Sequence, residues 1–188
     1  MIKVIGGKHR GRALATPEGD STRPTSSRAR ESLFNILAHA HWRADGMSPL
    51  IDARVLDGFA GSGALGIEAL SRGAAHATFL DTDATAIRLI GENLRTLKET
   101  AAAKVIRGDA TQPPPTREGC DLVFLDPPYR SNKAGPALAA LDAAGWIKPG
   151  AIATVEVGTA EDLLPPPGFE AIDERRYGAA KIVILRRA

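Results

Sequence analysis

One stretch of the chain, VLDGFAGSG from Val55 to Gly63, combines a carboxylate with a glycine-rich loop. The apolar strand leads into Asp57, and the glycines that follow leave the backbone free to bend close to a ligand. The next residues, 64–71, predict a helix that Gly73 ends. A strand, a glycine loop and a helix in this order present unpaired backbone N–H groups to a nucleotide-like cofactor. We therefore predict a cofactor site at this loop.

The position of Asp57 narrows the class of cofactor. The dinucleotide fingerprint G-x-G-x-x-G places a pyrophosphate at the helix N-terminus, whereas this loop reads D-G-F-A-G-S-G. A carboxylate at the strand end would repel a pyrophosphate but could hold a cationic amino-acid group. The loop resembles motif I of the class I S-adenosylmethionine-dependent methyltransferases, whose cofactor carries an ammonium and a sulfonium. An ordinary glycine turn is the alternative, and a second motif downstream weighs against it.

Carboxylates also follow the next two predicted strands. By resemblance to the methyltransferase class, Asp81, with Thr82 beside it, would bind the cofactor ribose, and Asp83 is the other candidate. On the same ground Asp109 would accept from the adenine amino group, with backbone N–H groups at Ala110 pairing with the ring nitrogens. Each acid could instead cap a loop or a helix, but acids at successive strand ends favour one shared site.

The tetrapeptide Asp126-Pro127-Pro128-Tyr129 follows the fourth predicted strand. An exocyclic amine on a base is a poor nucleophile because its lone pair is delocalised into the ring. Methylation therefore needs acceptors that hold the N–H groups and turn the lone pair toward the methyl group. Asp126 supplies one acceptor and the Pro127 carbonyl a second, at an angle that the paired prolines fix. Tyr129 can stack on a base extruded from its helix. The tetrapeptide alone is unremarkable, but its place after the fourth strand of a sheet whose first strand carries D-G-F-A-G-S-G indicates an amino-methyltransferase.

The ordinary pKa of an aspartate, about 3.9, makes Asp126 a weak base toward a neutral amine. We therefore expect Asp126 to orient the amine first. It would take a proton only after methylation has made the nitrogen acidic.

Strands that alternate with helices are predicted from Val55 onward. Further strands are predicted over 77–80, 104–106, 121–125 and 151–157, with helices at 64–71, after residue 83 and at 136–144. Two more strands, 169–176 and 181–185, follow without a helix between them. This order predicts an α/β fold, with a Rossmann-like, mostly parallel sheet of the class I S-adenosylmethionine-dependent methyltransferase type and a C-terminal antiparallel strand. Its ligands are expected at the carboxyl ends of the strands.

Residues 1–24 are predicted to form a basic β-hairpin extension that contacts RNA, and residues 25–188 the methyltransferase domain. The hairpin strands are expected at 2–5 and 13–15, with His9 exposed and solvated in the turn between them. Contact of His9 with a phosphate or a base edge is the alternative. A helix is expected from an N-cap at 25–27 to about residue 40. Phosphate contacts are predicted for the cations Lys8, Arg10, Arg12, Arg23, Arg28 and Arg30. A solvated basic face, or pairing with Glu31, is the alternative.

The composition places the chain among ordinary globular proteins of one domain. It has 188 residues, of which 44% are hydrophobic and 24% charged, with a net charge of +2. No run of about 18 apolar residues could span a bilayer, and the N-terminus lacks the apolar stretch of a secretory signal. The single cysteine, Cys120, excludes an intrachain disulfide and argues against a cysteine-built metal site. We expect a cytoplasmic monomer with no metal and no membrane partner.

Four stretches together resemble the RsmD family of bacterial 16S rRNA (guanine-N2)-methyltransferases: GGKHRGR, RPTSSRARESLFNIL, VLDGFAGSGALGIEALSRGA and VFLDPPY. The resemblance covers nearly the whole chain. It implies methyl transfer from S-adenosylmethionine to the N2 amine of a guanine in 16S rRNA, within the 30S subunit or its assembly intermediate. It also implies that residues 126–129 hold the guanine and that the cofactor pocket is lined by Asp57, Phe59, Gly61, Ser62 and Gly63.

Two other functions stay open at this point. A DNA adenine-N6 or cytosine-N4 methyltransferase would use the same tetrapeptide, but the chain has no separate domain to read DNA in a groove. A non-catalytic RNA-binding ribosome assembly factor would not need an intact Asp126–Tyr129 motif. The sequence leaves open which nucleotide is modified and whether Asp81 or Asp83 binds the ribose.

Overall fold

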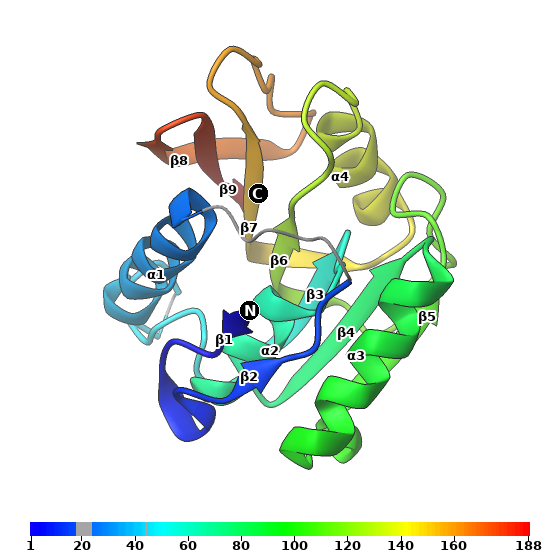
Figure 1. Cartoon of the computed structure of the whole chain (residues 1–188). Coiled ribbons are helices and arrows are strands. Elements are labelled where there is room, and N and C mark those ends of the chain that lie inside the picture. The colour runs from blue at the N-terminus through cyan, green and yellow to red at the C-terminus, as the bar shows by residue number, and fades with distance from the viewer. Residues whose placement is uncertain (18–23, 44) are drawn as a thin grey trace.

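A computed structural model describes residues 1–17, 24–43 and 45–188, without the side chains of residues 24–26 (Figure 1). Its main sheet has seven strands in the order β5-β4-β3-β6-β7-β9-β8. Their bounds are β3 (Arg54–Gly58), β4 (His76–Asp81), β5 (Ala103–Arg107), β6 (Cys120–Leu125), β7 (Ile147–Gly158), β8 (Phe169–Tyr177) and β9 (Ala180–Arg187). The helices are α1 (Pro24–His39), α2 (Ala64–Ser71), α3 (Ala84–Leu97) and α4 (Ala134–Ala143), with short 3-10 turns η1 (Gly7–His9) and η2 (Thr100–Ala102).

Strands β3 to β7 are parallel to one another, and β9 and β8 add an antiparallel pair at one edge. This arrangement confirms the mostly parallel sheet predicted from the sequence. The chain runs from β3 outward to β5 and then returns to the other side of β3 to form β6. Such a reversal opens a crevice at the carboxyl ends of the two central strands. A ligand site is therefore expected above β3 and β6.

The two faces of the sheet are covered by different helices. Neighbouring strand residues alternate between them, as Val55 and Leu56 do, because successive side chains of a strand point to opposite faces. One face packs against buried residues of α1, α2 and α3, including Phe34 and Ile90. The other face packs against α4 through residues such as Leu138. Each predicted helix therefore covers the sheet, and both faces are apolar.

Helix α1 begins at Pro24, before the N-cap predicted at residues 25–27. That prediction was wrong because proline, with its fixed φ and missing N–H, suits the first position of a helix. One face of the helix is apolar and buried, with Leu33 and Leu37 in the core. Tyr177 and Ser32 share a hydrogen bond that ties α1 to β8.

In the part of the chain that the structure describes, no helix is long and apolar enough to cross a membrane.

The N-terminal hairpin pairs β1 (Ile2–Lys3) with β2 (Ala13–Leu14) and is clipped onto α2 by a buried carboxylate. Glu68 has no exposed surface, and its two oxygens accept from the backbone N–H groups of Ile5 at 2.7 Å and Gly6 at 2.8 Å. Arg72 Nε donates to the same side chain at 2.7 Å. The hairpin is therefore part of the packed structure, and its Val4 joins the core cluster of α1, α2 and α3.

The expectation of an exposed His9 was wrong. Its side chain is only 17% exposed, and its Nε2 lies 2.5 Å from Glu99 Oε1. Lys8 Nζ lies 2.6 Å from the same oxygen. The turn folds as η1, and Glu99, which follows the end of α3, holds two of the side chains at the hairpin tip.

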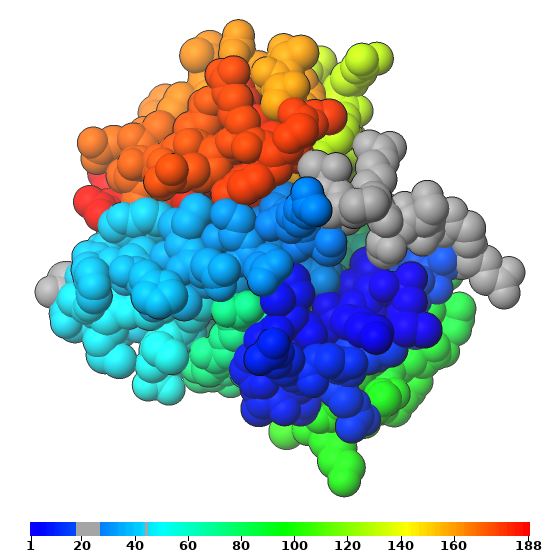
Figure 2. Space-filling view, turned by 60° about the vertical axis from the view of Figure 1, so that its left-hand side comes forward, coloured from blue at the N-terminus to red at the C-terminus, as the bar shows by residue number. Residues whose placement is uncertain are grey.

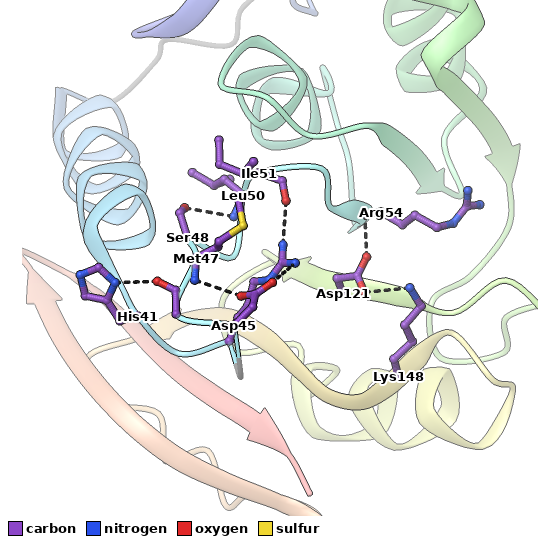
Figure 3. Close-up of polar contacts among 11 residues, drawn as sticks. His41, Asp45, Met47, Ser48, Leu50, Ile51, Arg54, Asp121 and Lys148 are labelled. Carbon is purple, nitrogen blue, oxygen red and sulfur yellow. Dashed lines mark hydrogen bonds and ion pairs between the residues drawn. The ribbon is translucent and has the colours of Figure 1, made fainter.

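A set of hydrogen bonds and ion pairs connects the amino ends of the central strands (Figure 3). Asp121 accepts from the backbone N–H of Arg54 at 2.9 Å and from Lys148 Nζ at 2.7 Å, which connects the starts of β3, β6 and β7. In the segment between α1 and β3, Asp45 pairs with Arg43 at 2.6 Å. These carboxylates are structural, whereas the acids at the carboxyl ends of the strands surround a cavity.

Candidate active site

A cavity of about 670 Å³ lies at the carboxyl ends of the parallel strands, above the junction of β3 and β6. This size is typical of sites for small ligands and cofactors. Most of the residues predicted for a cofactor or a base line this one cavity: Asp57, Phe59, Gly61, Ser62, Asp81, Thr82, Asp109, Ala110, Asp126, Pro127, Pro128 and Tyr129. The structure therefore brings residues from four separate strand ends to one cavity.

Asp57 is buried at the base of the cavity, and its Oδ2 accepts from the backbone N–H of Gly66 at 2.8 Å. The carboxylate thus fixes the first turn of α2, where backbone donors lack partners within the helix. Burial raises the pKa of Asp57 to about 7, the nearby charge of Asp81 adds to this, and the Gly66 hydrogen bond opposes it. Asp57 therefore holds the glycine loop and also places a titratable group under the cavity.

The glycine loop is folded tightly against the end of β4. The N–H groups of Phe59 and Ala60 both donate to the Leu80 carbonyl at 3.1 Å, and that of Gly61 donates to Asp81 Oδ2 at 2.8 Å. Phe59 has a φ of 126°, a conformation that side chains rarely adopt and that often marks a functional loop. The loop backbone is thus held in place before any ligand binds.

Gly63 lies outside the residues that line the cavity, unlike the other predicted loop residues. It has a φ of 80°, and a Cβ there would approach Ile90 and Phe79 to 3.2 Å. Its role in this structure is to let α2 begin close to the sheet and to α3.

The two candidates for the ribose differ in their surroundings. Asp81 lines the cavity, and its Oδ1 accepts from the N–H of Asp83 at 2.9 Å. Asp83 instead caps α3, because its Oδ1 accepts from the N–H of Thr85 at 2.8 Å, and it is not among the lining residues. Asp81 is therefore the better placed of the two.

Asp109 lines the cavity after β5, where its Oδ1 accepts from both the backbone N–H and the hydroxyl of Thr111 at 2.8 Å. The hydrogen bonds from Thr111, the backbone one first, lower the pKa of Asp109 below its usual value, against a small opposing effect of burial. The carboxylate is therefore charged at neutral pH and can accept from a ligand amine.

The Asp126–Tyr129 loop forms the wall on the side of β6 and β7. Asp126 is exposed and lines the cavity. Loss of hydration among the surrounding protein atoms raises the pKa of Asp126 well above the usual value, and the charges of Glu156 and Asp57 raise it further. The expectation of an ordinary pKa was therefore wrong. Tyr129 donates its hydroxyl hydrogen bond to Glu156 Oε1 at 2.6 Å.

The sequence analysis missed Glu156, which lies on β7 and lines the cavity. A signal for it exists, because it is the one charged residue within the apolar segment AIATVEVG. Such a residue in the middle of a sheet requires a polar neighbour or a ligand. Lys133 also lines the cavity and was missed. It lies just before α4 and shows no local pattern that would mark it.

The basic residues predicted to bind RNA fall into different settings. Arg10, Arg12 and Arg28 are exposed, and Lys8 is paired with Glu99. Arg30 is partly buried, lines the cavity and donates to the Lys3 carbonyl at 2.7 Å, and burial lowers its pKa. Arg23 lies outside the described residues. The hairpin and α1 lie beside each other on one face of the molecule (Figure 2).

Asp57 gives the protein a testable pH dependence. Its pKa is about 3.8 as an ordinary group and about 7 in the folded protein, so between these values only the unfolded chain has lost the proton. Raising the pH from about 4 to 7 therefore lowers the free energy of unfolding, by up to about 4 kcal/mol, and the loss levels off above pH 7. Asp57→Asn stays neutral and keeps an acceptor for Gly66, so it is expected to gain stability relative to the wild type over this range.

Chemical denaturation of both proteins between pH 4 and 8 measures the difference. The effects of all other titratable groups are common to both proteins and cancel. A difference that does not change with pH would show that Asp57 titrates as an ordinary carboxyl.

Comparison with known proteins agrees with the site. Residues 2–186 match the family model described as Conserved hypothetical protein 95. Ribosomal RNA small subunit methyltransferase D of Haemophilus influenzae is 38% identical over 181 residues, which are 94% of this chain and 89% of that protein. The protein of the same name from Escherichia coli K12 is 40% identical over 158 residues, 83% of this chain and 74% of that protein.

The solved structure of the Escherichia coli protein yhhF has the same fold. It superposes with a TM-score of 0.82 at 36% identity and covers 99% of this chain and 97% of its own. A family model over almost the whole chain, close relatives and a shared fold agree with one another. The chain therefore belongs to the RsmD family.

Proposed function

We propose that this protein transfers a methyl group from S-adenosylmethionine to the exocyclic N2 amine of a guanine in 16S rRNA of the small ribosomal subunit. The observation that carries the proposal is the Asp126–Tyr129 loop, which shares one cavity with the glycine loop and with the acids after β4 and β5. Membership of a family whose relatives are named small subunit rRNA methyltransferases supports it.

The acidic side chains that line the cavity fit S-adenosylmethionine. Its ammonium and sulfonium are cations, and carboxylates of Asp57, Asp81 and Asp126 line the cavity. Asp81 would accept from the ribose hydroxyls, and Asp109 from the adenine amino group. The cofactor supplies an electrophilic methyl group. Asp57 and the loop that it holds would position this group rather than react with it.

The protein's own contribution to the chemistry lies at residues 126–129. Asp126 and the Pro127 carbonyl accept from the amine, which turns its lone pair toward the methyl group. Tyr129 stacks on the base. The nitrogen gains a carbon and must lose one proton, and Asp126 is placed to accept it because its raised pKa makes it a stronger base than an ordinary aspartate. In-line positioning of the amine and the methyl group supplies the rest of the rate enhancement.

Residues 1–24 and the start of α1 would bind the RNA backbone. The exposed Arg10, Arg12 and Arg28 suit phosphate contacts. Arg30 would act deeper, because it lies at the wall of the cavity. Lys8 and Arg23 complete the proposed set. The ion pair with Glu99 would reduce the contribution of Lys8 to RNA binding, because the glutamate already offsets the charge of the lysine.

Methyl transfer from labelled S-adenosylmethionine tests the proposal. Small subunits that lack the modification, free 16S rRNA and duplex DNA are offered in parallel, and mass spectrometry identifies the modified base. N2-methylguanine in 16S rRNA is the expected product. Label in DNA would instead support an adenine-N6 or cytosine-N4 methyltransferase. Cofactor and RNA binding without transfer to any substrate would support a non-catalytic assembly factor.

A further inference from the structure

Glu156 and Asp126 stand side by side at the carboxyl ends of two neighbouring strands. In the parallel pairing of β6 with β7, Leu125 lies opposite Val155, so the next residues of the two strands are Asp126 and Glu156. Both line the cavity, and the charge of Glu156 acts on Asp126. The cavity therefore presents two adjacent carboxylates where the base would be methylated.

The position of Glu156 is fixed by the same loop that would hold the base. Tyr129 donates to Glu156 Oε1 at 2.6 Å, so the ring proposed to stack on the base is tied to this carboxylate. A carboxylate has about four acceptor positions on its two oxygens. One hydrogen bond from tyrosine therefore leaves Glu156 with capacity to accept from a ligand.

Two neighbouring acceptors distinguish guanine from the other bases that carry an exocyclic amine. Guanine presents two donors next to each other, the N2 amine and N1–H. Adenine places the acceptor N1 beside its N6 amine, and cytosine places the acceptor N3 beside its N4 amine. A second carboxylate beside Asp126 would face a lone pair in adenine or cytosine, and only guanine would satisfy both groups.

We propose that Glu156 is the specificity-determining residue of this site and accepts the N1–H of the guanine whose N2 amine is held by Asp126 and the Pro127 carbonyl. The inference rests on the proposed function and adds the group that selects the base. It also accounts for the one glutamate in an otherwise apolar strand, since a charged group in such a segment needs a polar neighbour or a ligand.

The experiment compares guanine with 2-aminopurine at the modified nucleotide, once mass spectrometry has located it. 2-Aminopurine keeps the amine at position 2 but has an acceptor at N1. Small subunits reconstituted with either base are methylated by the wild type, Glu156→Gln and Glu118→Gln. The last variant is the matched control, because Glu118 is 73% exposed, pairs with Arg54 and does not line the cavity.

The wild type and Glu118→Gln are expected to methylate guanine much faster than 2-aminopurine. Glu156→Gln can donate its amide N–H to the acceptor N1, so its ratio of the guanine rate to the 2-aminopurine rate is expected to fall by about 10- to 100-fold, the range for a hydrogen bond to a charged group. Tyr129→Phe keeps the ring and releases Glu156, and it should lower the same ratio by a smaller factor. The cofactor Kd, measured by calorimetry, should be unchanged in Glu156→Gln.

The possible failures are distinguishable. An unchanged ratio in Glu156→Gln, with N2-methylguanine still formed by the wild type, overturns the inference and leaves the proposed function standing. A higher Kd for the cofactor in Glu156→Gln, with an unchanged ratio of the guanine rate to the 2-aminopurine rate, would assign Glu156 to cofactor binding instead. A wild type that methylates adenine, or no base at all, overturns the proposed function and the inference that rests on it.

Discussion

Replacing Asp126 by alanine is expected to lower the rate of methyl transfer by about 1,000-fold, with the Kd of the cofactor changed only a few-fold. The carboxylate is the acceptor that orients the amine and takes its proton, and loss of one preorganised group of this kind removes factors of about 100 to 10,000. The alanine leaves the glycine loop intact, because Asp57, Asp81 and Gly61 hold that loop through contacts that do not involve Asp126.

Asp126→Asn separates orientation from proton transfer. The amide oxygen can still accept from the amine, so we expect this variant to lose about 10- to 100-fold, less than the alanine variant. The pKa of Asp126 is raised, so the wild-type carboxyl is protonated up to a higher pH than an ordinary aspartate. The wild-type rate should therefore fall as the pH is lowered through this raised pKa, and the fall should be absent in Asp126→Asn.

Single-turnover rates across pH, at saturating cofactor, measure both effects. Calorimetry of cofactor binding to each variant is the control for folding of the site. Equal losses in the alanine and asparagine variants would mean that proton transfer, not orientation, is the main role of Asp126. A wild-type rate that does not depend on pH would contradict the raised pKa.

The fold could be predicted from the sequence because its signals are local. Strand β6 was predicted at 121–125 and found at Cys120–Leu125, and α2 was predicted and found over residues 64–71. Apolar runs, helical spacing and glycine or proline stops fix such elements within a few residues. The acids at the strand ends were then located by a rule of topology, since the carboxyl ends of parallel strands meet at one edge of the sheet.

What the sequence did not reveal depends on pairs of residues distant along the chain. His9 was expected to be exposed because nothing near it in the sequence suggests a partner, and its partner Glu99 lies 90 residues away along the chain, after the end of α3. The segment 151–158 does mark Glu156 as a charge in an apolar strand, but the strand pairing that places it beside Asp126 is not visible in either segment alone. The pKa of Asp57 likewise follows from burial, which only the packed structure defines.

The way the hairpin is attached to α2 has a consequence for stability. Gly7 has a φ of 74°, and a Cβ there would lie 1.8 Å from the carbonyl oxygen of Ser71, the last residue of α2. The contact is with backbone, so the side chain of a neighbour cannot move aside to relieve it. An alanine at position 7 must therefore lift the hairpin off the helix.

Gly7→Ala is expected to lower the free energy of unfolding by about 3–5 kcal/mol, because lifting the hairpin leaves the buried Glu68 carboxylate without the N–H groups of Ile5 and Gly6. Gly11→Ala is the matched control in the same hairpin. Its φ is 82° and a Cβ there meets nothing within 4 Å, so only the strain of a left-handed residue remains, about 1–2 kcal/mol.

Denaturant unfolding compares the stability of the two variants. Hydrogen exchange at the amides of Ile5 and Gly6 reports directly on their hydrogen bonds to Glu68. Faster exchange at both amides in Gly7→Ala, with wild-type exchange in Gly11→Ala, is the expected pattern. The hairpin carries Arg10 and Arg12, so its displacement should also weaken binding of 16S rRNA more than the control does. Equal losses of stability in the two variants would mean that the hairpin shifts without breaking its hydrogen bonds to Glu68. Equal affinities for 16S rRNA would mean that the attachment of the hairpin to α2 does not position these arginines.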